Sequence, residues 1–94
     1  MVFAKQLRDG IRRGEITRTV RIWQRCHVKV GGRYRMGNGH VVVTTIRPIA
    51  LADITGSLAR QCGFKGVVDL LKIAKHGSGR SVFLIDFYYR SGDP

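Results

Sequence analysis

Residues 12–23 of the chain read Arg-Arg-Gly-Glu-Ile-Thr-Arg-Thr-Val-Arg-Ile-Trp. The pattern predicts a helix that ends at Gly14 and a strand over residues 16–23. Side chains alternate along a strand, so its two faces differ. The apolar face carries Ile16, Val20 and Ile22, and the other face carries Thr17, Thr19, Arg21 and Trp23. Hydroxyls, a guanidinium and an indole on one face suit a nucleotide or phosphate better than a core, so we expect a ligand cleft here.

The elements around this stretch can be predicted from spacing and turn residues. Phe3, Leu7 and Ile11 recur every four residues and predict a short amphipathic helix before Gly14. Strands over residues 33–36 and 40–46 form a predicted hairpin, with Gly-Asn-Gly between them as the turn. Three consecutive valines at 41–43 indicate a strand buried on both faces, and Pro48 is expected to end or bulge that strand.

The second half of the chain predicts two helices and a strand. Asp53 or Thr55 is expected to cap a helix that Gly63 ends, and apolar spacing over residues 67–74 predicts another helix. Residues 82–89 alternate as a final strand, and residues 90–94 are expected to form a frayed tail. The order predicts one α+β domain over residues 1–94, whose short, twisted strands can close into a small barrel.

The charge of the chain is strongly unbalanced. Its 17 Lys and Arg residues oppose 6 Asp and Glu residues, which gives a formal net charge of +11. Residues 1–35 alone hold ten basic and two acidic side chains. Such a field attracts polyanions, so we expect a nucleic-acid partner, either RNA or DNA. The alternative is that the net charge only keeps a small protein soluble.

Cysteine spacing and hydropathy limit the kinds of site and the cellular compartment that we expect. Cys26 and Cys62 lie far apart without CxxC spacing, which predicts free thiols rather than a metal site or disulfide framework. The first residues carry charges where a signal peptide needs an apolar run, and no stretch reaches transmembrane length. We therefore expect a cytoplasmic protein without metal, cofactor or membrane contact, present as a monomer or weak homodimer.

Four stretches, taken in order over residues 3–89, resemble an ASCH domain. They are Gly14-x-x-x-x-Thr19-x-Arg21 after the helix, Val30-Gly31-Gly32-Arg33-Tyr34, Gly63-Phe64 before a helix, and the closing Val82-Phe83-Leu84-Ile85-Asp86-Phe87 strand. The resemblance implies a PUA-like fold, a small mixed or antiparallel β-barrel with two to three short helices at its mouth. It also implies a cleft lined by a Gly-x-Lys-x-x-Thr-x-Arg motif and work on RNA. Some small bacterial members are amidohydrolases that deacetylate N4-acetylcytidine, and others bind or cleave RNA.

The chain departs from this family's catalytic pattern. The amidohydrolases use a Lys, a Thr and a Glu. The Thr corresponds to Thr19, but Ile16 stands where the Lys belongs. The position of the Glu falls near Cys62, and no carboxylate lies between Asp53 and Asp69. Without the lysine, a hydroxyl nucleophile loses its activation. The resemblance therefore implies binding of RNA, with an enzyme acting on RNA or a modified nucleoside as the alternative and Thr19 as its candidate catalytic residue.

Candidate binding residues follow from charge and aromatic character. Arg21 is expected to clamp a phosphate beside Thr19, the alternative being a polar pair on a solvated face. Trp23 and Tyr34 either stack on an unpaired base or cap the core. The predicted cationic contacts are Arg12, Arg13, Arg18, Arg25, Lys29, Arg33, Arg35, Lys75 and Arg80.

Two further patterns have alternative interpretations. The loop from Lys75 to Arg80 either cradles a phosphate or is a flexible connector. Cys62 as a nucleophile with His76 as its base is one interpretation. The alternative is that Cys62, near a helix end, is a small core residue, which is more typical of such a position.

Overall fold

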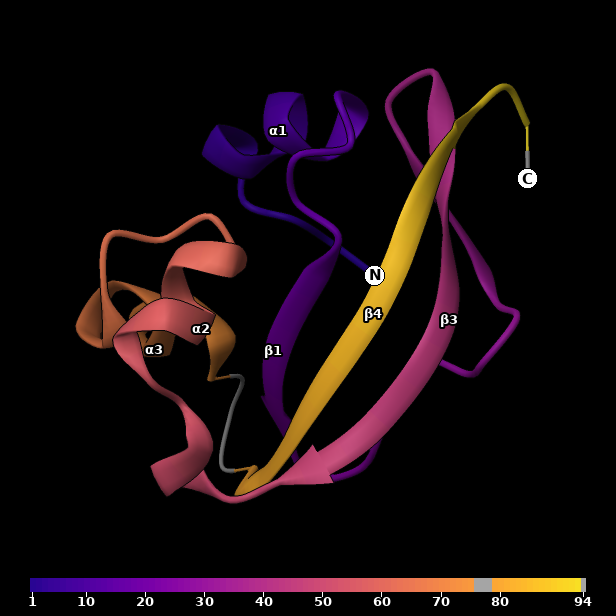
Figure 1. Cartoon of the computed structure of the whole chain (residues 1–94). Helices are drawn as coiled ribbons and strands as arrows, with labels where there is room; N and C mark the ends of the chain where they lie inside the picture. Colours follow the sequence, from indigo (N-terminus) through magenta and orange to yellow (C-terminus); the bar gives the residue numbers. More distant parts are fainter. Residues whose placement is uncertain (76–78, 94) are drawn as a thin grey trace.

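The computed structural model describes residues 1–75 and 79–93 of the chain. Four antiparallel strands form one curled sheet in the order β1 (Arg18–Trp23), β4 (Ser81–Ser91), β3 (Gly39–Ile49) and β2 (Arg33–Met36). Short helices lie before β1 and between β3 and β4, as Figure 1 shows. The protein is thus a small α+β protein with a half-barrel sheet, which confirms the predicted class.

The longest strands form the centre of the sheet. β3 and β4 pair from Gly39 opposite Ser91 to Ile49 opposite Val82. All three valines at 41–43 are buried, as predicted. The strand does not end at Pro48: the pairing shifts between Val43 and Thr45, and β3 then continues to Ile49. Pro48 is tolerated because β2 pairs with only the first residues of β3, so this part of β3 has one free edge.

The helix before β1 is shorter than expected and consists of two parts. A 3-10 turn, η1 (Lys5–Leu7), leads into α1 (Arg8–Arg12). The turn that follows needs Gly14, which adopts a φ of 76°. The carbonyl of Gly10 accepts the N–H groups of both Glu15 and Ile16, which redirects the chain toward β1.

The helices between β3 and β4 follow their predicted signals. After the 3-10 turn η2 (Leu51–Asp53), Thr55 caps the start of α2 (Gly56–Gln61), and its hydroxyl accepts the N–H of Leu58 at 3.1 Å. Gly63, with a φ of 92°, follows α2. The second predicted helix is α3 (Val67–Ala74). In the described residues, no helix is long and apolar enough to cross a membrane.

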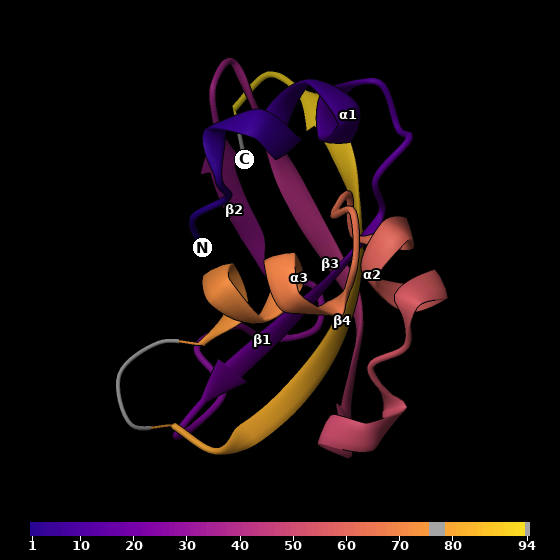
Figure 2. The same cartoon turned by 90° about the vertical axis from the view of Figure 1, so that its left-hand side faces the viewer.

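Both faces of β1 are buried, which contradicts the alternative of a polar pair on a solvated face. On the outer face of the curled sheet, Val20 and Ile22 belong to a cluster formed with α2 and α3. On the inner face, Thr19, Arg21 and Trp23 are each 7% exposed or less. The N-terminal segment shares this inner side, where Phe3 packs on Phe87. Figure 2 shows α2 and α3 beside β1, with α1 near one end of the sheet.

The end of the chain also differs from the expected frayed tail. Arg90 and Ser91 are the last residues of β4. Beyond them, the Gly92 N–H donates to the Asn38 carbonyl at 3.0 Å, and Arg35 pairs with Asp93 at 2.7 Å. These contacts attach residues 90–93 to the hairpin of β2 and β3, because the turn at Asn38 lies beside the end of β4. Pro94 lies outside the described residues.

Candidate functional site

Arg21 and Thr19 lie together, as the sequence predicts, but within the protein. The Arg21 Nε donates to the Thr19 hydroxyl at 3.2 Å, and its Nη2 donates to the Val2 carbonyl at 2.7 Å. The guanidinium carbon lies 5.0 Å from the ring centroid of Phe3 and 5.9 Å from that of Trp23. The guanidinium is therefore held by a hydroxyl, a carbonyl and two aromatic rings.

Burial governs the charge of this group. None of the ion pairs formed by the described residues involves Arg21. Burial lowers the pKa of Arg21 to about 10, since the charged form loses its hydration. A ligand phosphate does not reach the guanidinium while Val2 and Phe3 lie against it. In this conformation the predicted cleft is filled by the protein's own N-terminal segment.

The two aromatic residues predicted to stack on a base pack with core residues instead. Trp23 is 5% exposed and meets the His27 ring edge-on, with 4.8 Å between centroids. Tyr34 is half-buried, and its hydroxyl accepts the Lys29 N–H at 3.0 Å. Both rings pack in the cluster around Val43, which favours the core alternative for them.

The predicted cationic residues divide into two groups. Four of them form ion pairs within the protein: Arg12 with Asp9, Arg13 with Glu15, Arg18 with Asp86 and Arg35 with Asp93. The others are exposed and make no ion pair with another described residue: Arg25, Lys29, Arg33, Lys75 and Arg80. Because each pair neutralises one charge of each sign, the whole excess of +11 remains on the other side chains.

Further exposed cations were not among the predicted contacts. They are Lys5, Arg47, Arg60, Lys65, Lys72 and Arg90, and none makes an ion pair in the described part of the chain. Most lie in the last two thirds of the sequence, where the charge excess is smaller. Spacing carried no signal for them, because their positions on the folded surface depend on strand register and helix packing.

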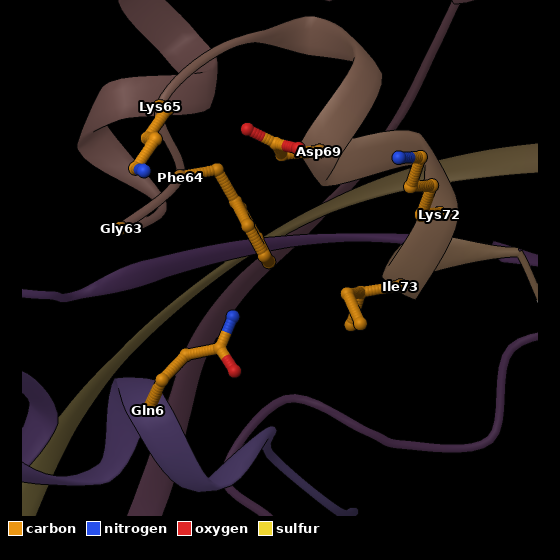
Figure 3. Close-up of a pocket in the computed structure, with 7 residues that line it drawn as sticks. All are labelled: Gln6, Gly63, Phe64, Lys65, Asp69, Lys72 and Ile73. Atoms are coloured by element: carbon orange, nitrogen blue, oxygen red, sulfur yellow. The ribbon is translucent and has the colours of Figure 1, made fainter.

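A pocket of about 520 Å³ lies between the N-terminal helical segment and α3. Its lining residues are Gln6, Gly63, Phe64, Lys65, Asp69, Lys72 and Ile73. Figure 3 shows the Phe64 ring reaching into its middle, with Gln6 on one side and Asp69 and Lys72 on the other. The pocket therefore has two ammonium groups, one carboxylate and one aromatic ring in its lining. None of its lining residues was predicted as a binding residue, and Gly63 and Phe64 entered only through the resemblance.

Ile16, at the position where the ASCH resemblance implies a lysine, is a packing residue. It lies with Leu7 against Gly63, where an added Cβ would come within 2.6 Å of Ile16 and 2.7 Å of Leu7. Ile16 also packs against the cluster that includes Phe87. An apolar side chain here closes the space between α1 and the end of α2, so the residue has a structural role.

The imagined cysteine nucleophile is poorly placed for chemistry. Cys62 is 1% exposed and belongs to the cluster under α2 and α3. Burial raises the pKa of its thiol to about 11, so the reactive thiolate is scarce near neutral pH. His76 and residues 77 and 78 of the predicted phosphate loop lie outside the described residues. The described residues also contain no group of His, Cys, Asp and Glu suited to a metal ion.

Asp86 joins three elements on the outer side of the sheet. Its carboxylate accepts a hydrogen bond from Arg18 at 2.9 Å and another from Thr45 at 2.7 Å. Burial alone would raise the pKa of Asp86, but the bonds from Arg18 and Thr45 and the charge of Arg47 outweigh it and lower the pKa. Arg18 also donates to Gln61 of α2 at 3.0 Å. The network thus ties β1, β3 and α2 to β4.

Replacing Asp86 by asparagine is expected to lower the free energy of unfolding by about 1 kcal/mol at neutral pH. Because the folded-state pKa is lowered, this stabilisation is present above the ordinary aspartate pKa and is lost as pH falls through the folded value. Urea unfolding near pH 7 and near pH 3 measures the difference. Asp9→Asn is the control, since Asp9 is exposed and its loss should change little. A pH-independent Asp86→Asn effect would contradict the assignment.

No protein-family model, curated protein or solved structure matches this chain.

Proposed function

We propose that the protein binds RNA through exposed arginine and lysine side chains, and that it is an ASCH-like module with a PUA-like half-barrel. The observation that carries the proposal is the distribution of charge. Four of the six acidic residues are paired with arginines, whereas eleven cations lie exposed without an ion pair among the described residues. A phosphate backbone is the common cellular polyanion that such a surface attracts.

Binding rather than catalysis is the function that the site supports. Ile16 packs against the core where the resemblance implies a lysine that would activate a nucleophile, and Thr19 is 7% exposed beside Arg21. Cys62 holds its proton because of its burial. Phosphate contacts require only exposed cations, and these are abundant.

A salt titration tests the proposal. Fluorescence anisotropy with labelled single-stranded RNA, duplex RNA and DNA should give affinities whose logarithm falls linearly with the logarithm of salt concentration. The slope reports the number of phosphates that the protein neutralises. No binding to RNA at low salt would overturn the proposal.

Matched variants separate exposed cations from paired ones. Arg25→Gln with Lys29→Gln removes two charges that form no ion pair within the described part of the chain, and Arg12→Gln with Arg13→Gln removes two charges that are paired with acids. The first double variant should weaken RNA binding more, because the partners of Arg12 and Arg13 already cancel part of their field. Equal losses would show that net charge alone controls binding.

A further inference from the structure

The outer face of the sheet is only partly covered by helices. Val82 and Leu84 of β4 pack under α2 and α3, in the same cluster as Val20 and Ile22. Since side chains alternate along β4, Asp86, Tyr88 and Arg90 point to this same face. The cluster under the helices stops at Leu84, so the second half of β4 carries this face beyond their cover (Figure 1).

The strand register places cations around an exposed aromatic ring on this uncovered part. Tyr88 lies opposite Val42 of β3, which lies opposite Arg33 of β2. In the next row toward the end of β4, Arg90 lies opposite His40 of β3, which lies opposite Arg35 of β2. Directly opposite residues of antiparallel strands project from the same side of the sheet. Tyr88 is 44% exposed, so its ring is available to a partner.

The arginines of these rows differ in how they are neutralised. Arg35 pairs with Asp93, whereas Arg33 and Arg90 are exposed and have no ion pair in the described residues. Strands lie about 4.8 Å apart and alternate residues of one strand lie about 6.7 Å apart, so both guanidinium groups can reach a strand lying across Tyr88. Val42 is 9% exposed and forms the apolar floor beside the ring.

We propose that this sheet face, made by Arg33, Val42, Tyr88 and Arg90, binds an unpaired segment of RNA. The inference rests on the proposed function and names the surface and the form of RNA involved. A base stacks on Tyr88, and the flanking phosphates meet Arg33 and Arg90. A stacked base must be unpaired, because both faces of a duplex base are occupied by its neighbours. The closed Arg21 site takes no part.

The first test measures the stacking contact. Tyr88→Ala should weaken binding of labelled oligouridine about 10-fold with little change in salt slope, because stacking adds affinity without neutralising phosphates. Tyr88→Phe is the matched control and should bind like the wild type, since it keeps the ring. Circular dichroism and thermal unfolding establish that both variants fold. A folded Tyr88→Ala protein with unchanged affinity would overturn the inference.

The second test counts the phosphates at this face. Arg33→Gln with Arg90→Gln should reduce the magnitude of the salt slope by about 1.4, the value for two contacts to a single strand. Lys5→Gln with Arg60→Gln removes the same charge from exposed positions on η1 and α2 and should change the slope less. Equal changes would overturn this assignment of the surface.

The outcomes separate this inference from the proposed function. RNA binding that is insensitive to changes at Tyr88, Arg33 and Arg90 would leave the function standing and move the interface elsewhere. Absence of RNA binding in the wild type would remove both. If the wild type copurifies with an acidic protein and Tyr88→Ala abolishes that association instead, the sheet face is a protein interface and the inference is wrong.

Discussion

Replacing Arg21 by alanine is expected to lower the free energy of unfolding by about 3 kcal/mol. The side chain fills space between Phe3 and Trp23 on the inner face of the sheet, and its loss leaves a cavity there. The Val2 carbonyl also loses its hydrogen-bond donor. Urea unfolding monitored by Trp23 fluorescence measures the change, because the indole lies in the affected cluster.

Arg21→Met separates the volume of the side chain from its charge. Methionine refills most of the space without a buried charge. The free energy of unfolding of the Arg21→Met variant should therefore match that of the wild type at neutral pH or exceed it by up to about 1 kcal/mol. Any advantage should shrink above pH 10. There the folded wild type releases the Arg21 proton before the unfolded chain does, which relieves the cost of burying the charge. A methionine variant as unstable as the alanine variant would show that the guanidinium contacts dominate.

Gly39→Ala is expected to lower the free energy of unfolding by about 2–3 kcal/mol, which shifts the Tm by about 10 °C or more. Gly39 lies where the β2–β3 hairpin meets the end of β4, opposite Ser91. An added Cβ would overlap the Arg90 carbonyl and the Tyr89 hydroxyl. The carbonyl belongs to the backbone of β4, so the strand itself would have to move.

Gly31→Ala is the matched control for this prediction. Gly31 has a φ of 81°, but no atom of the described residues lies within 4 Å of an added Cβ. Its replacement therefore adds backbone strain alone, about 1 kcal/mol. Thermal unfolding followed by circular dichroism compares the two variants. A Gly39→Ala protein no less stable than Gly31→Ala would show that β4 yields to the methyl group without cost.

Local signals in the sequence predicted the kinds of element and several of their ends. Thr55 caps α2, Gly14 turns the chain before β1, and the Gly37-Asn38-Gly39 turn joins β2 to β3. Each signal depends on a few neighbouring residues. The prediction that Pro48 ends or bulges its strand was wrong for a non-local reason. The effect of a proline on a strand depends on whether another strand pairs at that edge.

The candidate site was only partly predictable. The proximity of Thr19 and Arg21 follows from their spacing on one strand, and the structure brings them to 3.2 Å. The burial of Arg21 does not follow from spacing, because it depends on Val2 and Phe3, which lie against its guanidinium. The pocket beside Phe64 likewise combines separate segments that no spacing rule relates.

The sequence by itself determined the α+β class, the order of the elements and the +11 charge, because local spacing and composition carry that information. Only the tertiary structure decided which polar residues meet solvent. A strand has the same alternation whether one face or both are covered, and the covering groups come from distant parts of the chain. Packing by the N-terminal segment and by α2 and α3 buried β1 on both sides, whereas strand pairing placed Tyr88 and Arg33 on either side of Val42 on one face of the sheet.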